Sequence, residues 1–223
     1  MSEPLQFQFE TLTLGGHDYQ IRSLLDRQQY DDPDGAAARA GINSATWPLF
    51  GMVWPASKVL AETMCDFPIA GKRILEVGCG TALASIVLRQ QGADITASDL
   101  HPMADPFLAV NLALNDLEPI PFDTGSWSDG SEALGEFDLI IGSDLLYERD
   151  HPSQLADFID RHGGCDAEVI LVDPKRGQQG RFGKAMAALG FEQRADLPTP
   201  AVEGEAFFGG RVLNFVRGPT QEG

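Results

Sequence analysis

The sequence has little cysteine and little positive charge. Its three cysteines, Cys65, Cys79 and Cys165, are too few and too scattered for a disulfide framework, and their odd number suits a reducing compartment. Lysine and arginine number 16 against 33 aspartate and glutamate residues, so the 223-residue chain carries a formal net charge of −17. Because binding to phosphate backbones or anionic lipid depends on basic surface, we expect no nucleic-acid partner and no membrane partner.

Long apolar segments are also lacking. No apolar run follows Met1 and no basic residue precedes Arg22, so the N-terminus has no secretory signature. Apolar runs such as residues 139–141 are far too short to cross a membrane. We therefore expect a cytoplasmic protein. The hydrophobic content of 43% is nevertheless sufficient for a sizeable core, and the length predicts one domain.

Residues 1–70 are predicted to form a hairpin, a loop and a covering helix. Apolar residues alternate over residues 5–25 on either side of a Gly-Gly turn, a pattern typical of two antiparallel strands. Residues 31–41 lack strand or helix periodicity and are predicted to be a mobile loop. An amphipathic stretch within residues 55–68 predicts the helix.

Residues 71–223 alternate between strand and helix patterns and are predicted to fold as one unit. The alternation indicates a doubly wound, Rossmann-like α/β sheet with right-handed crossovers. The predicted strands are residues 73–77, 94–98, 137–142, 168–172 and 212–216, and the predicted helices are residues 82–91, 103–114, 151–162 and 180–189.

The strongest motif is the segment Glu-Val-Gly-Cys-Gly-Thr-Ala at residues 76–82, where an apolar strand enters a glycine turn and then a helix. Such a turn lets a ligand approach the backbone closely, and Asp99, at the end of the next strand, can accept hydrogen bonds from both hydroxyls of a ribose. A dinucleotide site would have glycine in place of Leu83. In a second interpretation the ligand carries a cationic amino-acid group, which the carboxylate of Glu76, two places before Gly78, would face. In a third, the turn binds no ligand and its glycines serve only tight packing.

The combination of this motif with Asp99 resembles motif I of the class I S-adenosylmethionine-dependent methyltransferases. The resemblance implies that Gly78 and Gly80 line the cofactor, that Glu76 lies near its methionine part, and that Asp99 binds its ribose. The third glycine of the family motif is an alanine here.

A second motif, Asp-Leu-Leu-Tyr at residues 144–147, follows the predicted strand that begins at Phe137. It is similar to the Asp-x-x-Tyr signature of the seven-β-strand, family-16 protein methyltransferases. Further similar segments lie around Trp-Pro at residues 54–55, Asp-Leu-His-Pro at residues 99–102 with Asn111 and Asn115, and Asp-Pro-Lys-Arg at residues 173–176. Over residues 47–190 the chain most resembles the lysine methyltransferases of the electron-transfer flavoprotein β subunit.

This resemblance implies a mostly parallel seven-stranded sheet whose last strand is antiparallel. It also implies S-adenosylmethionine as the cofactor, S-adenosylhomocysteine as the product, and a protein substrate with an accessible lysine. The expected reaction is N-methylation of that lysine. Two alternatives remain open: methylation of a small-molecule amine or another nitrogen nucleophile, and a module that binds the cofactor without turnover.

Asp144 and Tyr147 are the predicted catalytic residues. A lysine amine has a pKa near 10.4 and must lose its proton before its lone pair can attack, so the site has to bind and orient it. Asp144 can bind the incoming ammonium, and Tyr147 can add an oxygen contact or an aromatic face. An ordinary carboxylate is too acidic to be a strong general base. Alternatively, Asp144 caps the following turn and Tyr147 packs.

Two tryptophans are further candidates for the cofactor site. Trp127, after an expected third strand, resembles the family's cofactor-adjacent tryptophan, and Trp54 can form a wall of the pocket. For both, simple packing is the alternative explanation. Asp173 lies at a strand end, where ligands gather, but an Asp-Pro pair also forms turns. Lys175 and Arg176 can contact an acidic feature of a substrate or be solvated.

No metal site is predicted. The residues closest to a cluster in the sequence are His151, His162, Cys165 and Asp166, and their spacing matches no standard zinc pattern. The oligomeric state is not predicted from the sequence.

Overall fold

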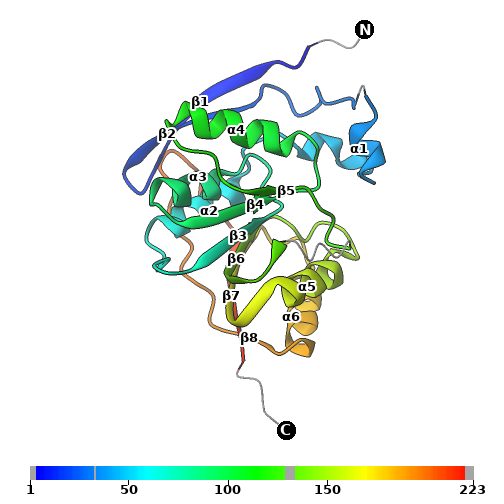
Figure 1. Cartoon of the computed structure of the whole chain (residues 1–223), viewed down its shortest axis with the longest axis vertical. Coiled ribbons are helices and arrows are strands. Elements are labelled where there is room, and N and C mark those ends of the chain that lie inside the picture. The colour runs from blue at the N-terminus through cyan, green and yellow to red at the C-terminus, as the bar shows by residue number, and fades with distance from the viewer. Residues whose placement is uncertain (1–3, 33, 129–133, 219–223) are drawn as a thin grey trace.

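A seven-stranded sheet forms the centre of the computed structural model, which describes residues 4–32, 34–128 and 134–218 (Figure 1). The strand order is β5-β4-β3-β6-β7-β9-β8; the first five are parallel, and β9 is antiparallel to both of its neighbours. The expected doubly wound sheet with an antiparallel last strand is therefore confirmed. The strands are β3 (Arg73–Val77), β4 (Asp94–Ser98), β5 (Phe122–Asp123), β6 (Phe137–Ser143), β7 (Gly163–Asp173), β8 (Phe191–Gln193) and β9 (Arg211–Arg217).

Alternation along the buried strands separates two hydrophobic clusters, one on each face of the sheet. In β6, Leu139 and Ile141 belong to the first cluster and Ile140 to the second, as the two-residue period of a strand requires. Each of these three side chains is fully buried. Both faces of the sheet are therefore covered, as is usual for parallel sheets.

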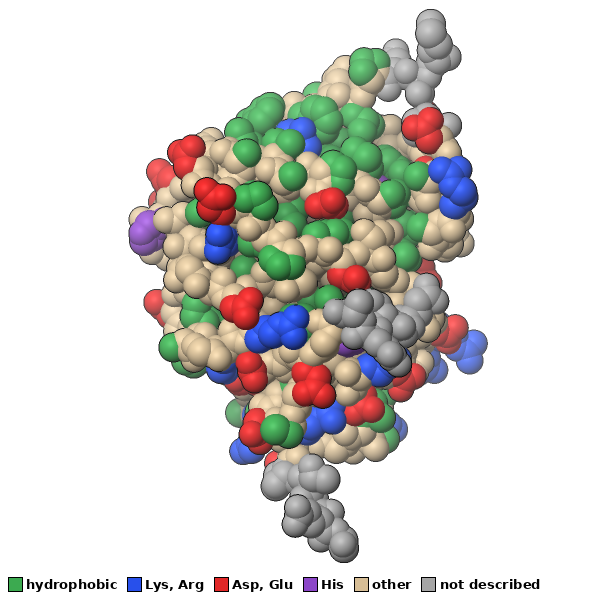
Figure 2. Space-filling model, in the orientation of Figure 1, with side chains coloured by type: hydrophobic (Ala, Val, Ile, Leu, Met, Phe, Trp, Pro, Cys, Tyr) green, Lys and Arg blue, Asp and Glu red, His purple; other side chains and the backbone are tan. Residues whose placement is uncertain are grey.

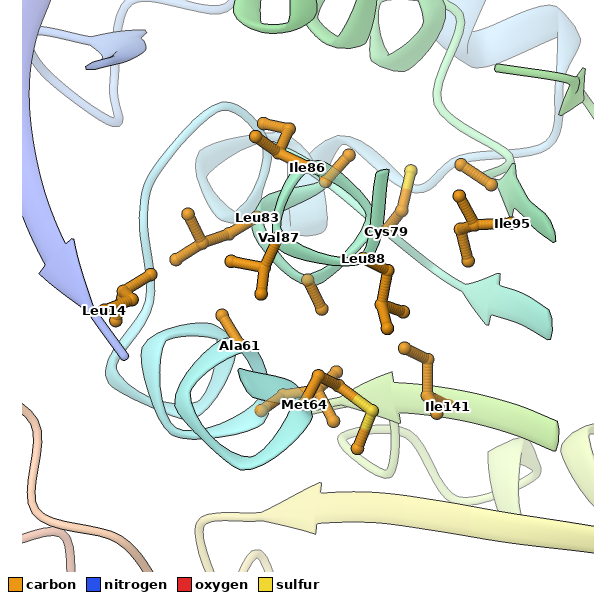
Figure 3. Packing of buried hydrophobic residues seen from close by; sticks show 14 of the residues in the cluster. Leu14, Ala61, Met64, Cys79, Leu83, Ile86, Val87, Leu88, Ile95 and Ile141 are labelled. Atoms are coloured by element: carbon orange, nitrogen blue, oxygen red, sulfur yellow. The ribbon is translucent and has the colours of Figure 1, made fainter. Parts of the chain in front are cut away.

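Helices cover the two faces. On one face lie α2 (Pro55–Cys65), α3 (Leu83–Gln90) and α4 (Ala104–Leu114), and on the other α5 (His151–His162) and α6 (Gln179–Ala188). Figure 3 shows Ala61 and Met64 of α2 packed against Val87 and Leu88 of α3, with Ile141 of the sheet beside them. No helix in the described ranges is both long and apolar enough to span a membrane.

The N-terminal hairpin, β1 (Phe7–Leu14) and β2 (His17–Leu24), lies outside the helices of the first face (Figure 1). Two asparagines on α4 hold it there. Asn111 accepts a hydrogen bond from the Arg22 amide and donates to the Arg22 carbonyl, and Asn115 does the same with Gln20. Because residues 111 and 115 are one helical turn apart, they match alternate residues of β2.

The sequence predicts a loop over residues 31–41. The structure differs, because a short helix, α1 (Ala36–Arg39), forms within them. The Asp32 carboxylate accepts hydrogen bonds from the amides of Ala37 and Ala38, which satisfies donors that a helix start leaves free. A 3-10 helix, η1 (Ser44–Leu49), follows and is capped by Asn43. This ordered connection forms one wall of the cavity described below.

Most other predicted boundaries agree with the structure within one or two residues. One exception is β7, which begins at Gly163 rather than at residue 168, because Gly163 pairs with Phe137 of β6 ahead of an irregularity in the register. The edge strand β8 was not predicted, since only Phe191 of its three residues is buried.

The surface divides by side-chain type in the view of Figure 2. Hydrophobic side chains gather over the part where β1, β2 and α4 lie in Figure 1, and acidic and basic side chains alternate over the rest. Among the exposed large hydrophobic residues, Phe9 belongs to β1 and Leu114 to α4. Phe7 is partly shielded because it contacts Phe107 of α4, with ring centroids 5.9 Å apart.

We expect the substitution Asn111→Ala to lower the free energy of unfolding by about 2–3 kcal/mol, because it leaves the buried Thr81 carbonyl and the partly buried backbone groups of Arg22 without a partner. Asn115→Ala is the matched control, since Asn115 is partly exposed and water can replace its contacts; about 1 kcal/mol is expected. Urea unfolding measures both values. Equal losses would contradict the role assigned to burial.

Candidate active site

A cavity of about 180 Å³ opens at the carboxyl ends of β3, β4 and β6. This is where chain connections leave the sheet in opposite directions, the usual ligand position in doubly wound sheets. Seven of the eight predicted site residues line it: Trp54, Gly78, Gly80, Asp99, Trp127, Asp144 and Tyr147. The other lining residues are Ile42, Thr46, Leu49, Phe50, Leu100, His101, Ser143, Leu145 and Arg176.

The glycine turn after β3 needs residues that tolerate positive φ. Gly78 has φ +60°, and a Cβ placed there would lie 2.5 Å from Cδ2 of Leu145. Gly80 has φ +56°, and a Cβ there would meet no atom within 4 Å, so a ligand can approach its backbone. Ala82, in the place of a third glycine, adopts φ +59° at the start of α3 and bears the strain of that conformation.

Asp99 joins the turns that follow β3 and β4. Its Oδ2 accepts a hydrogen bond from the Gly80 amide and its Oδ1 from the His101 amide, both at 2.8 Å. Burial raises the pKa of its carboxyl, and these amide donors oppose that rise. Each oxygen still has an acceptor position free, so the carboxylate can bind two adjacent hydroxyl groups of a ligand.

Glu76 does not line the cavity. Its carboxylate is buried beneath the glycine turn and accepts hydrogen bonds from the amide and the hydroxyl of Ser85 in the first turn of α3. Burial raises the pKa of Glu76 to about 7, against the opposing effect of Ser85. The structure thus places Glu76 as a cap of α3, and its predicted role toward a ligand stays a prediction.

Asp144 follows β6 in a left-handed conformation with φ +56°, unusual for a residue other than glycine. Its amide donates to the Val172 carbonyl at 2.8 Å, which fixes the backbone to the end of β7. Its carboxylate forms a bidentate ion pair with Arg176, with Nε on one oxygen and Nη2 on the other. A strained residue held by two such contacts at a cavity is typical of a functional site.

The pairing of Arg176 with Asp144 is not predicted from the sequence. The loop after β7 is organised by Asp173, whose Oδ1 accepts hydrogen bonds from the Lys175 and Arg176 amides and from the Gln179 side chain. Asp173 is 2% exposed and does not line the cavity. Its contacts are those of a residue that forms a turn, which is one of the two interpretations of the sequence. No pattern in the sequence joins residues 144 and 176; only the pairing of β6 with β7 brings them together.

Tyr147 lies at the rim of the cavity and is 41% exposed. Its ring packs edge-on against His151, with centroids 4.5 Å apart, and His151 is held by the Leu145 carbonyl at 2.8 Å. Burial, with a smaller effect of Asp99, raises the pKa of Tyr147 to about 12, so its hydroxyl is protonated at neutral pH. It can therefore donate as well as accept a hydrogen bond there.

The two tryptophans come from different connections of the chain. Trp54 precedes α2, and its indole nitrogen donates to the Leu49 carbonyl at 2.9 Å. Trp127 packs edge-on against His151, with ring centroids 5.2 Å apart, and its carbonyl accepts a hydrogen bond from Arg161. Both side chains line the cavity and also contact neighbouring residues. A place in the pocket and a packing role are therefore compatible for each tryptophan.

His101 is a lining residue that was not among the predicted site residues. Its ring stacks on Phe50, with centroids 3.6 Å apart, and its Nδ1 accepts a hydrogen bond from the Met103 amide. Burial lowers its pKa to about 4, so the ring is neutral and its proton sits on Nε2. That buried Nε2 has no partner in the described part of the chain. The signal in the sequence was its place two residues after Asp99, at a strand end.

The cavity therefore combines a turn open to close approach, a carboxylate suited to a diol, and a second carboxylate beside a phenol. No group of three or more histidine, cysteine, aspartate or glutamate side chains is placed to hold a metal within the described ranges. His162, one of the residues considered above, is held by the Gly135 carbonyl, and Cys165 is exposed.

Comparison with known proteins identifies similar sequences. A family model described as lysine methyltransferase matches residues 46–187, more than half of the chain. The electron transfer flavoprotein beta subunit lysine methyltransferase of Xenopus laevis is 30% identical over 146 residues, 59% of this chain and 54% of that protein. Protein N-lysine methyltransferase METTL21A of Danio rerio is 29% identical over 139 residues, 57% of this chain and 63% of that protein. The chain spans little more than half the length of these relatives.

Solved structures share the fold. Magnesium protoporphyrin IX methyltransferase (ChlM) from Synechocystis, solved with bound SAM, matches with a TM-score of 0.58 and 18% identity, covering 84% of this chain and 92% of that one. At this identity the likeness concerns the architecture alone, which includes the Rossmann-like sheet described above.

We expect the stability of the wild-type chain to fall, relative to Glu76→Gln, as pH rises from 5 to 8. The folded chain keeps Glu76 protonated up to about pH 7, whereas the unfolded chain releases that proton near the ordinary glutamate pKa of 4.5. The stabilisation is therefore fully present below pH 4.5 and lost as pH rises through 7, a change on the order of 3 kcal/mol.

Glutamine keeps an oxygen for the Ser85 amide and does not titrate, so it isolates the effect of Glu76 from that of His101, whose lowered pKa acts in the opposite direction. Urea unfolding of both proteins at several pH values gives the difference. Parallel curves across this range would show that Glu76 is ionised in the folded chain.

Proposed function

The chain belongs to the lysine methyltransferase family, and we propose that it transfers a methyl group from S-adenosylmethionine to a lysine side chain of a protein. The observation that carries this proposal is the single cavity that joins the glycine turn and Asp99 to Asp144 and Tyr147. The first pair is suited to a nucleoside, and the second to an amine. Their meeting at one strand edge supports a transfer between two ligands bound side by side.

The methyl donor is S-adenosylmethionine, and the residues of this cavity fit it. The free acceptor positions of Asp99 suit the ribose hydroxyls, the open space at Gly80 allows backbone approach, and the unpartnered Nε2 of His101 offers a donor to a nucleoside. When bound, this donor supplies a methyl carbon: a bond forms from that carbon to the acceptor nitrogen as its bond to sulfur breaks, and sulfur keeps the electron pair as a thioether.

The amine end of the cavity supports a side chain presented by another protein. The Tyr147 residue is 41% exposed and the Arg176 side chain 38% exposed, so this end is open to solvent. A lysine ammonium loses its proton at a cost of roughly 4–5 kcal/mol at neutral pH. Asp144 binds and orients the nitrogen, Tyr147 contributes its hydroxyl or ring face, and the proton leaves to water through the open rim.

The test is transfer of label from S-adenosylmethionine with a tritiated methyl group into dialysed lysate of the source cell, followed by acid hydrolysis of labelled protein. We expect labelled methyl-lysine from the wild type. Asp144→Asn should lower the rate by about 100-fold because the amine loses the carboxylate that orients it. It should leave the affinity for S-adenosylhomocysteine, measured by calorimetry, within a small factor, whereas Asp99→Asn should weaken it about tenfold.

Asp150→Asn is the matched control, since Asp150 lies on the same connection after β6, is exposed and does not line the cavity. It should behave as the wild type. Label in the small-molecule fraction of undialysed lysate, with none in protein, would overturn the lysine proposal in favour of a metabolite amine. Cofactor binding without label in either fraction would indicate a binding module.

A further inference from the structure

The proposed function gives a role to Asp144 but none to Arg176. The guanidinium of Arg176 binds the Asp144 carboxylate. The two side chains form a bidentate ion pair with two hydrogen bonds, and both line the cavity. The Asp144 side chain is only 14% exposed, so the pair is less screened than an ordinary surface ion pair. Asp144 also raises the pKa of Arg176, which is therefore charged at any pH of interest.

The backbone on both sides holds this pair in place. Asp144 is pinned to the Val172 carbonyl, directly beside the register pair Ser143 and Val172 of β6 and β7. Arg176 is pinned by the buried Asp173, which accepts its amide hydrogen bond at 3.3 Å. Arg176 is thus presented by an ordered turn at the adjacent strand end, so the pair belongs to the framework of the site.

The pair leaves room for an acceptor. Each carboxylate oxygen of Asp144 accepts one hydrogen bond from Arg176, and an ionised carboxylate has about four acceptor positions. One position on each oxygen remains for an amine. However, the carboxylate and the guanidinium together carry no net charge, so the pair attracts a cation far less than a bare carboxylate does.

Two of the titratable side chains that line this end of the cavity carry no charge at neutral pH. His101 is neutral and Tyr147 is protonated, as described above. Asp173 faces the backbone of its own turn. The remaining charged or titratable groups around Asp144, Arg176 and Tyr147 are Asp99, Glu148 and His151. Arg176 is therefore the sole permanent cation among the lining residues in the described part of the chain.

We propose that Arg176 is a positioning residue of the methyl transfer: it orients the Asp144 carboxylate and cancels its charge, so that the site holds the acceptor amine in its neutral, nucleophilic form. This inference rests on the proposed function. A fixed cation beside an amine disfavours the ammonium form, so the amine gives its proton to water before its lone pair takes the methyl group. The nitrogen donates one hydrogen bond to Asp144, which aims the lone pair away from the carboxylate.

The test is the pH dependence of label transfer into the gel-resolved protein band that the wild type labels in dialysed lysate, at saturating tritiated S-adenosylmethionine. For Arg176→Gln we expect the rising limb of the profile to move to higher pH by on the order of one unit or more. The rate should fall about tenfold at pH 7 and approach the wild-type rate above pH 9. Millimolar guanidinium chloride, but not sodium chloride, should restore part of the rate at pH 7 to Arg176→Ala.

Lys175→Gln is the matched control, because it removes the same charge from the neighbouring residue, which does not line the cavity. Its profile should coincide with that of the wild type. A rate of Arg176→Gln that is lowered equally at every pH, or not lowered, would overturn the inference while the wild type remains active. Failure of the proposed function is a different result, since the wild type itself would then label no protein. Calorimetry with S-adenosylhomocysteine shows whether each variant is folded.

Discussion

The close approach of Gly78 to Leu145 is the contact on which the site depends. Gly78 begins the turn after β3 and Leu145 lies in the turn after β6, and a Cβ on Gly78 would lie 2.5 Å from Cδ2 of Leu145. Because β3 and β6 are adjacent parallel strands, this contact brings the glycine turn at one end of the cavity against the turn that carries Asp144 and Tyr147. The carbonyl of Leu145 also forms a hydrogen bond with His151, against which Tyr147 packs. Leu145 therefore contacts the glycine turn and also positions the support of Tyr147.

Polar side chains connect the periphery to this centre. Asn111 binds the Arg22 backbone of the hairpin and also donates to the Thr81 carbonyl within the glycine turn. Glu76 anchors the start of α3 beneath that turn, and Asp99 anchors the turn from the β4 side. The backbone of the turn is thus held from several directions. Ala82, the left-handed residue at the end of the turn that is not glycine, keeps its strained conformation because the surrounding structure fixes it.

The sequence allowed the strands β3 and β4 and the helix α5 to be placed at their observed bounds, because their apolar patterns are strong and their ends are marked by turn residues. The two-residue strand β5 has too few residues to show a period, and α1 forms because the Asp32 side chain caps it. Seven of the eight predicted site residues meet at one cavity, since each lies at or near a strand or helix end. The pairing of Asp144 with Arg176 depends on strand register between residues 32 positions apart, which local patterns do not report.

The choice of arginine at position 176 has a further consequence. An enzyme that methylates amines cannot safely keep an amine of its own beside the transfer site, because that amine would be an acceptor in every catalytic cycle. A guanidinium carries the required positive charge without an available lone pair, since it does not lose its proton at physiological pH. None of the residues that line the cavity, across the described part of the chain, is a lysine. Under the proposed function, the cavity therefore offers the methyl donor no lysine amine of its own.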